Sequence, residues 1–402
     1  MDTQSDRLPS LAVLPFNNMS GDPEQEYFAD GVVEDILTAL SRFKSFAVVA
    51  RTSSFVYKGR AVDVRQVSRE LGVRYVLEGS VRRSGSRVRI TAQLVDGTNG
   101  SHLWAERYDG MLEDIFDVQD RITESVVGIV EPHIREAEIQ RSRKERPESL
   151  EAYDLYLRAL PRFRLGLEEP NREAFELLRK ALEIEPDNAA FLAEASRVVE
   201  RALVLGWSPL TADDRATCAD YARRGLATAG NDAAALATCA VSLMSAVGDE
   251  HVGMATIRRA VEINPNQSRV LLSAGIANLH HGPLEDALYC FERNLRLSPA
   301  SPSAYVSMTG IAHVRMAMGN YGEALKAAEQ SLAVTADYSP TYWMLAAAAA
   351  QLGRMEDAKR WVARLLAIEP HASLKQIRAA QPFGERVKAI LDGLALAGLP
   401  ES

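Results

Sequence analysis

The feature that most constrains this chain is a short pattern that recurs six times between Ala152 and Pro370. In each copy, a small residue in an apolar segment is followed twelve positions later by a turn. Successive small residues are 44, 35, 34, 37 and 34 positions apart. A period near 34 is typical of a two-helix repeat that stacks on its own copies. The small residues are Ala174, Cys218, Gly253, Ala287, Ala324 and Ala358, and the turns are at Pro186, Gly230, Pro265, Pro299, Ala336 and Pro370.

The residues within one copy resemble the tetratricopeptide pattern. If Pro299 closes its repeat at position 32, Gly275, Ala287 and Phe291 fall at positions 8, 20 and 24. Small residues at 8 and 20 let two helices approach closely, and a bulky residue at 24 fills the space between repeats. We therefore expect six helix pairs over residues 147–372, with a lengthened loop near Trp207, and a capping helix over residues 373–402.

The first 146 residues follow a different pattern. Residues 1–8 are mostly polar and predict a flexible leader. Apolar runs bounded by turn residues then predict strands at 11–14 and 46–50, and amphipathic segments predict helices at 27–43 and 62–71. Asp63 is expected to cap the second of these helices and Gly72 to end it.

From residue 74 the hydrophobic period changes from 3.6 to 2. Residues 75–83 and 87–96 predict an antiparallel hairpin with one solvated face, and residues 102–108 a third strand. A long helix follows and continues into the charged run 135–146, which we expect to be solvated. The order of elements predicts an α+β domain over residues 9–146, with the helices on one face of a mixed sheet and a boundary at Pro147.

Four segments of this domain carry a resemblance to a known family: 12–20 (AVLPFNNMS), 26–31 (EYFADG), 75–81 (YVLEGSV) and 90–96 (ITAQLVD). They resemble the TolB-like amino-terminal domain of bacterial regulatory proteins. In that family tetratricopeptide repeats follow the domain, and a class III adenylate or guanylate cyclase domain or a winged-helix DNA-binding domain often precedes it. The resemblance implies a multidomain protein, with an α+β TolB-like domain followed by an all-α tetratricopeptide superhelix. Because this sequence starts at the TolB-like domain, we expect neither upstream effector.

Charge and apolar runs limit the function classes. The formal net charge is −8 and the isoelectric point about 5.6, so the chain lacks the basic character of nucleic-acid-binding proteins. The first residues do not form a secretion signal, and no apolar run reaches the ~20 residues of a membrane-spanning helix. Cys218, Cys239 and Cys290 lack metal-binding spacing and are expected to be buried, reduced thiols. We expect a cytoplasmic protein with no nucleic-acid partner and no membrane span.

No motif gives a starting point for catalysis. The sequence contains no GxxxxGK[ST] loop, no GxGxxG after a strand, no HExxH and no GxSxG. Asp30 superficially resembles the strand-borne aspartate with which class III cyclases hold metal ions. A two-metal site needs a second carboxylate, however, and Asp30 is expected in the first turn of a helix. We therefore expect no catalytic residue, no cofactor and no metal ion.

The hairpin carries a compact basic cluster, with Arg74 nearby. One interpretation is a docking patch for an acidic partner or a phosphate, because guanidinium groups match oxyanions. The alternative is a solvated sheet edge that charge keeps soluble. The arginines of the cluster are Arg82, Arg83, Arg87 and Arg89.

The stacked repeats predict a second candidate site. Such repeats form a superhelix whose first helices line a concave groove, where protein partners usually bind. Met316 and Trp343 fit a core role equally well, and His280 and His313 are expected to be polar groove residues rather than metal ligands. The groove candidates are Arg269, Leu272, Ile276, His280, His313, Met316 and Trp343.

Two functional hypotheses follow. The first is a non-enzymatic scaffold in signal transduction that binds a protein or peptide in the repeat groove, with the TolB-like domain as a docking or sensory unit. The second is the regulatory half of a cyclic-nucleotide cyclase or of a transcriptional regulator whose effector domain lies on another chain or is missing. The sequence leaves the partner, any ligand of the TolB-like domain and the oligomeric state open.

Overall fold

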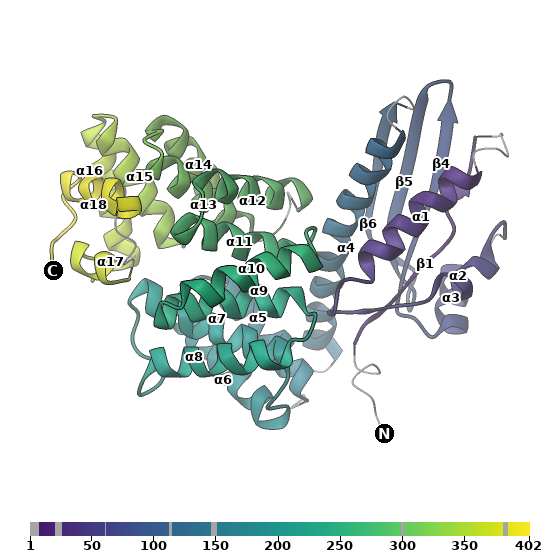
Figure 1. The fold of residues 1–402 in the computed structure, drawn as a ribbon, viewed down its shortest axis with the longest axis horizontal. Coiled ribbons are helices and arrows are strands. Elements are labelled where there is room, and N and C mark those ends of the chain that lie inside the picture. Colours follow the sequence, from purple (N-terminus) through teal and green to yellow (C-terminus); the bar gives the residue numbers. More distant parts are fainter. Residues whose placement is uncertain are drawn as a thin grey trace. The chain divides into compact units, whose positions relative to one another are not determined.

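The computed structural model describes residues 8–20, 26–60, 62–111, 115–145, 151–298, 301, 303–380 and 385–402. The chain divides into two compact units, residues 1–147 and 148–402, and each is described by itself. The first unit combines a sheet with helices, and the second is helical throughout its described residues (Figure 1). Of the predicted leader, only Leu8 lies within the described residues.

The first unit is built on a mixed sheet with strand order β3-β1-β4-β5-β6, and β2 pairs with β4 beside this path. β1 runs parallel to β3 and to β4, whereas β4, β5 and β6 are antiparallel. The predicted hairpin and third strand are confirmed, and β6 is longer than expected. The strands are β1 (Ser10–Val13), β2 (Asn17–Asn18), β3 (Ala47–Val48), β4 (Tyr75–Ser84), β5 (Arg87–Asp96) and β6 (Ser101–Met111).

Helices cover both faces of this sheet, which corrects the expectation of one covered face. Leu11 and Val13 of β1 pack with α1 and α4, whereas Ala12 and Leu14 point the other way and pack with Val67 of α3. Side chains alternate between the faces of a strand, so a continuous apolar run such as 11–14 requires cover on both sides. The helices are α1 (Glu26–Leu40), α2 (Arg51–Ser54), α3 (Val64–Leu71) and α4 (Ile115–Glu145), with a short 3₁₀ turn at Phe55–Tyr57.

The ends of α3 follow the predicted capping. The side chain of Asp63 accepts a hydrogen bond from the backbone N–H of Arg65 at 2.9 Å. Gly72 ends the helix in the left-handed conformation at φ 64°, where a side chain is disfavoured.

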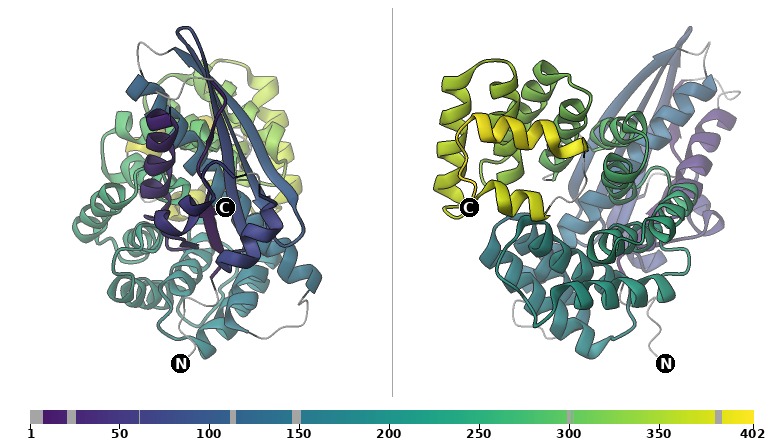
Figure 2. Two further views of the ribbon diagram at one scale, coloured as in Figure 1. Left: turned by 90° about the vertical axis from the view of Figure 1, so that its right-hand side faces the viewer. Right: turned by 60° about the vertical axis from the view of Figure 1, so that its left-hand side comes forward.

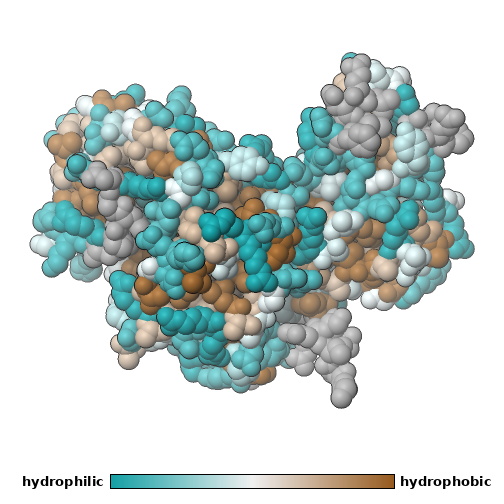
Figure 3. Space-filling model, viewed as in Figure 1, coloured by the Kyte–Doolittle hydropathy of each residue, from teal (hydrophilic) through white to brown (hydrophobic). Residues whose placement is uncertain are grey.

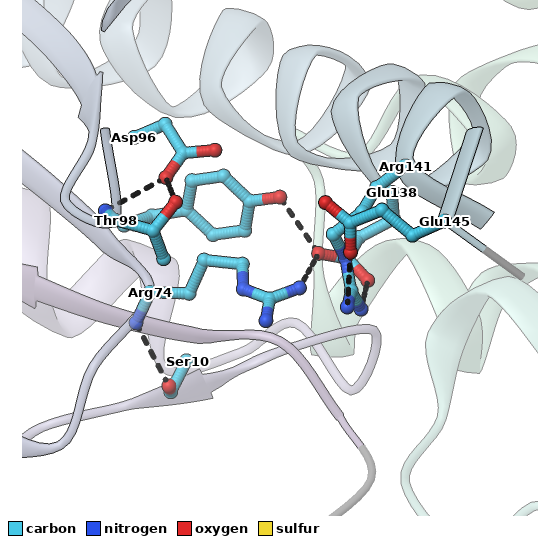
Figure 4. A network of polar contacts seen from close by, with 8 residues as sticks. Ser10, Arg74, Asp96, Thr98, Glu138, Arg141 and Glu145 are labelled. Carbon is cyan, nitrogen blue, oxygen red and sulfur yellow. Dashed lines mark hydrogen bonds and ion pairs between the residues drawn. The ribbon is translucent and has the colours of Figure 1, made fainter. Parts of the chain in front are cut away.

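A buried ion network holds the charged end of α4 to the sheet (Figure 4). Glu138 is only 1% exposed. Its carboxylate accepts hydrogen bonds from Tyr75 at 2.7 Å, from Arg74 at 3.2 Å and from Arg141 at 2.7 Å. The charged run is therefore not simply a solvated helix end, because the Glu138 carboxylate within it is buried and accepts a hydrogen bond from Tyr75 of β4.

Burial alone raises the pKa of Glu138. Hydrogen bonds from Arg141 and Tyr75 and the charges of Arg141 and Arg74 outweigh that effect and hold the pKa below its usual range. Glu138 therefore remains ionised at neutral pH, and its three partners compensate for the lost hydration.

The second unit consists, over its described residues, of six helix pairs followed by two shorter helices (Figure 2). We call the first helix of each pair the A helix and the second the B helix. The A helices are α5 (Ala152–Arg164), α7 (Ala189–Leu205), α9 (Ala233–Val247), α11 (Ser268–His281), α13 (Ala304–Ala317) and α15 (Ser339–Gln351). The B helices are α6 (Glu168–Ile184), α8 (Asp214–Thr228), α10 (Glu250–Ile263), α12 (Leu284–Leu297), α14 (Tyr321–Val334) and α16 (Met355–Ile368).

The packing between helix pairs follows the sequence pattern, in which a bulky side chain fills the space beside small residues. Phe291 of α12 is fully buried. A Cβ atom added to Gly275 of α11 or to Gly310 of α13 would lie 2.6 Å from the Phe291 ring. The ring therefore fills a space between two A helices that only glycine leaves open. All six predicted small residues lie on B helices and are buried.

The lengthened loop in the second repeat is present between α7 and α8. The Trp207 indole nitrogen lies 3.4 Å from Glu369 Oε1, and the backbone N–H of Ser208 donates to Glu168 at 2.9 Å. Gln376 donates from α17 to the carbonyl of Leu205 at 3.0 Å. The extra residues thus connect the second repeat with the first and the sixth repeats, and the end of α7 contacts α17.

The C-terminal segment forms two helices rather than the single capping helix that we expected: α17 (Leu374–Ala380) and α18 (Glu385–Leu396). α17 contacts α7. α18 lies across the A helices α13 and α15 rather than only over the last repeat (Figure 2). α18 therefore also covers part of the side of the stack on which the groove residues were predicted.

Candidate functional site

The predicted groove residues lie on three A helices. Arg269, Leu272, Ile276 and His280 recur at helical spacing on α11 and are half-buried. On α13 and α15, His313 is 9% exposed, Met316 1% and Trp343 4%. The last two belong to the hydrophobic core of the later repeats, so the core role that the sequence allowed for them is the one observed.

Helix α18 packs against α13 and α15 in this region. Gly393 approaches Ala347 of α15 so closely that an added Cβ would lie 2.7 Å from the Ala347 Cα atom. The Gln351 side chain donates to the carbonyl of Ala389 at 3.1 Å. Trp343, Ala347 and Gln351 are four residues apart on α15, so they share one face of that helix. The face that the sequence marked as a groove therefore carries a segment of the same chain.

Arg386 fixes the N-terminal end of α18. Its guanidinium donates to the carbonyls of Asn278, Leu279 and Gly282 at 2.9, 2.7 and 2.8 Å. These carbonyls lie at the C-terminal end of α11, where the last carbonyls of a helix lack helical partners and the helix dipole favours a cation. Sequence reasoning missed Arg386, because no local pattern relates it to a helix end more than one hundred residues earlier.

Two histidines lie beside Arg386. The His280 and His313 rings have centroids 5.7 Å apart. Burial lowers the pKa of His313 to about 4; a backbone hydrogen bond with Arg386 opposes the shift and the Arg386 charge adds to it. Burial, together with His313, His281 and Arg386, also lowers the pKa of His280 well below its usual value. Both rings are therefore neutral at pH 7.

A second polar cluster, which the sequence did not single out, lies on α7. Glu194 pairs with Arg197, and Arg269 of α11 lies 3.5 Å from Glu194. The guanidinium of Arg201 stacks 3.4 Å from the centroid of the Phe163 ring. Residues 194, 197 and 201 recur at helical spacing in a helix whose other side chains are mostly apolar, which is a signal that could have identified this polar face.

The hairpin arginines do not form one patch. Arg82 lies opposite Arg89 on the solvated face, whereas Arg83 lies opposite Val88 and so shares the face of the buried residues. Arg89 is paired with Asp109 at 2.7 Å, and Arg87 is exposed. Arg74 belongs to the Glu138 network instead. The structure brings together Arg82, Arg87 and Arg89 and places an acidic side chain among them.

Other candidate chemistry is occupied by structural contacts. Asp30 lies in the second turn of α1 rather than its first, and it pairs with Lys58 at 2.6 Å. Among the described residues, no group of three His, Cys, Asp or Glu side chains could hold a metal ion. Cys218, Cys239 and Cys290 are free and buried as predicted, and burial raises the pKa of Cys239 to about 12. Within the residues that the structure describes, no helix is both long and apolar enough to cross a membrane.

Large exposed apolar side chains are spread over the second unit, including Leu165, Ile184, Tyr289 and Leu396. On the face shown in Figure 3, apolar residues of the helical part alternate with polar ones. These four lie on or directly after four different helices, and single apolar side chains scattered in this way are normal on a protein surface. The better candidate for a binding site is therefore the inner side of the A helices, by which we mean the side that carries Arg269, Leu272 and Ile276 on α11.

Two families match parts of this chain. The family described as "HilA/YgeH-like transcriptional regulator, second domain" matches residues 6–125, and the tetratricopeptide repeat family matches residues 315–380. The C-terminal part thus contains tetratricopeptide repeats, and the N-terminal part resembles a domain of HilA-like regulators.

A protein of Rhizobium meliloti (strain 1021) named "Putative adenylate cyclase 3" is 46% identical over 235 residues. The match covers 58% of this chain and 40% of the relative, so this chain spans less than half of that protein.

Solved structures show more distant likenesses. A tetratricopeptide repeat protein from Parabacteroides merdae is 16% identical, and the match covers 69% of this chain and 98% of that one with a TM-score of 0.39. TolB from Acinetobacter baumannii is 17% identical over 32% of this chain and 29% of that one, with a TM-score of 0.24. The second likeness is too weak to confirm the TolB-like assignment, which stays a prediction.

Proposed function

We propose that this protein is a non-enzymatic scaffold in bacterial signal transduction that binds a protein partner on the inner side of its A helices. The observation that carries the proposal is the half-buried row Arg269, Leu272 and Ile276 on α11, beside the Glu194 and Arg197 cluster. Tetratricopeptide stacks provide extended binding surfaces of this kind. A mixed polar and apolar face supplies both buried area and orientation to a bound segment.

In this proposal the first unit is a TolB-like docking or sensory domain, and the protein works in the cytoplasm. The resemblance of its strand and turn segments to bacterial regulators supports that role, as does the match to a domain of HilA-like regulators. Its solvated arginines Arg82, Arg87 and Arg89 are the proposed docking patch, with Arg83 on the opposite face of the hairpin.

The test is affinity capture from a lysate of the source bacterium with the full chain as bait. The double variant Arg269→Ala/Leu272→Ala should lose the captured partner while its helical signal shows that the repeats stay folded. Lys359→Ala is the matched control, because Lys359 is 60% exposed on the B helix α16. Equal capture by wild type and double variant would refute binding on this face.

A second candidate function is the regulatory half of a nucleotide cyclase system. The 46% identity to a protein named as a putative adenylate cyclase favours it. We expect no cyclic AMP from the purified chain with ATP and Mg²⁺ or Mn²⁺, but a changed rate when the chain is mixed with a separate cyclase catalytic domain from the source bacterium. Sustained turnover by the chain alone would show that it is an enzyme.

A further inference from the structure

We propose that the face formed by α13, α15 and the C-terminal end of α11 is a docking site for an amphipathic helix of a partner protein, and that α18 occupies this site in the free chain. This inference rests on the proposed scaffold function and deepens it by naming the kind of partner. We call these surfaces together the helix-docking face.

The first argument is the way in which α18 lies on the face. Its buried apolar side chains are Val387, Ile390 and Leu394, at positions i, i+3 and i+7. This is the spacing with which amphipathic helices fill apolar grooves in protein recognition. The outward side of the same helix carries the exposed Lys388 and Asp392. α18 therefore binds its own chain as a recognition helix binds a partner.

The second argument is the shape of the receiving surface. α15 contributes the buried run 346–350, which consists of five alanines. Alanine side chains are short, so a second helix can approach the α15 backbone closely. Gly393 uses this space, because even a methyl group at that position would meet the backbone of Ala347 at 2.7 Å. The helix-docking face therefore favours a helix in which a small residue follows the first buried apolar side chain by six positions, as Gly393 follows Val387.

The third argument is charge. The carbonyls of Asn278, Leu279 and Gly282 converge on one guanidinium, that of Arg386. A helix end that presents carbonyls prefers a cation. The partner helix therefore carries a basic residue directly before its first apolar anchor, as α18 does.

The fourth argument concerns how α18 can leave. A helix of twelve residues is too short to persist alone in water, so α18 is helical because it is docked. Beyond α18, the chain end is held by hydrogen bonds from Leu374 to the Pro400 carbonyl at 2.8 Å and from Lys375 to the Glu401 carbonyl at 3.0 Å. Pro400 and Glu401 are exposed, whereas Leu374, Ala397 and Leu399 are buried, so these contacts open together with α18. A tethered occupant lowers the apparent affinity of every competitor, so a partner binds only when its helix outcompetes α18.

The experiment uses the full chain and a fluorescent synthetic peptide of residues 385–399. In the variant Val387→Asp/Ile390→Asp, α18 undocks while the repeats stay folded. We expect this variant to bind the peptide at least about tenfold more tightly than wild type does, because the tethered competitor is gone. Binding should protect the backbone amides of α13 and α15 from hydrogen exchange.

The control peptide carries Gly393→Ala. Alanine favours helix formation over glycine, so this peptide is more helical in solution. Its methyl group meets Ala347, so we expect binding about tenfold weaker. Equal or tighter binding of the control peptide would show that helicity alone drives the interaction and would refute the helix-docking face.

Hydrogen exchange of wild type keeps the proposal testable if the double variant fails to fold. Excess wild-type peptide should raise exchange in α18 and leave exchange in α9 unchanged. If α18 exchanges only with global unfolding, it is a fixed part of the core and the proposal is wrong. A dimer in light scattering, formed by exchange of α18 between two copies, would also refute a partner from another protein. Because the probe is the chain's own peptide, a failure here leaves the lysate capture test of the scaffold function standing.

Discussion

α4 and α18 are helices that lie on the body of their own unit, but they are held in different ways. α4 buries Glu138, whose carboxylate has three hydrogen-bonding partners, and it contributes five apolar side chains to the main core cluster of the unit. α18 buries three apolar anchors and is fixed by one half-buried guanidinium and by neutral histidines beneath it. The apolar residues of α4 in this set are Ile122, Val126, Val127, Val130 and Ile134.

The two helices differ in the polar groups that lose their partners when the helix detaches. Removal of α4 exposes a paired carboxylate and separates it from the sheet residues Arg74 and Tyr75. Removal of α18 frees an arginine that water solvates well and helix-end carbonyls that water can also satisfy. On the proposal above, α4 is a permanent part of its unit, whereas α18 exchanges with a competitor.

The largest effect is expected from Glu138→Ala. Loss of the carboxylate leaves Arg74, Tyr75 and Arg141 without their shared acceptor, and the first unit should lose about 3 kcal/mol of its free energy of unfolding. Hydrogen exchange in α4 and β4 measures this loss as a function of denaturant. Glu145→Ala is the matched control, since the Glu145 side chain is 59% exposed on the same helix. Equal behaviour of the two variants would contradict a locked α4.

A smaller effect is expected from Arg386→Met, which keeps the aliphatic length and removes the charge. Charge-assisted hydrogen bonds contribute on the order of 2 kcal/mol, and water can replace part of them here. Protection of the α18 amides should fall, while that of α9 stays constant. Lys388→Met changes an exposed cation on the same helix and should leave α18 unaffected. A similar loss in both variants would mean that net charge, and not the contact with α11, holds the helix.

Acidification should also loosen α18. The pKa of His313 is about 4 in the folded chain and about 6.5 when unfolded, so stability from its neutral form is present above pH 6.5 and is lost as the pH falls toward 4. Between pH 7 and pH 5 this amounts to about 2 kcal/mol from His313 alone. His280 acts in the same direction, because its pKa is lowered as well.

Hydrogen exchange of α18 at pH 7 and pH 5, corrected for the intrinsic rate, measures the acid effect locally. A local measurement is needed because burial raises the pKa of Glu200 and of Glu369, and these groups oppose acid destabilisation of the whole unit. In His313→Gln the pH dependence of α18 should shrink. An unchanged pH dependence would show that His313 is not its source.

The smallest effect is expected on the open face of the first unit. Asp109 and Arg89 are paired but about half exposed, so Asp109→Asn should leave the unfolding midpoint of this unit unchanged. A large destabilisation would show that the hairpin pair is structural and would weaken its assignment as a docking patch. Arg82→Ala, on the same face, is the control.

Local patterns in the sequence predicted much of the fold. The period near 34 located the helix pairs, and Phe291, which was expected to fill the space between repeats, lies against Gly275 and Gly310. Asp63 and Gly72 end α3 as expected, because caps depend on neighbouring residues. Helices on both sheet faces were missed, although the unbroken apolar run at 11–14 required them.

The sequence by itself determined the repeat period, the ends of α3 and the face of α11 to α15 that carries the groove candidates. Each of these depends on residues a few positions apart, whose geometry helical and strand periods fix. Only the tertiary structure decided what covers that face and what pairs with Glu138. Arg386 and the α11 carbonyls are more than one hundred residues apart, and Arg74 and Glu138 are 64 apart. Such contacts arise from the folding of distant segments onto one another, which no local period records.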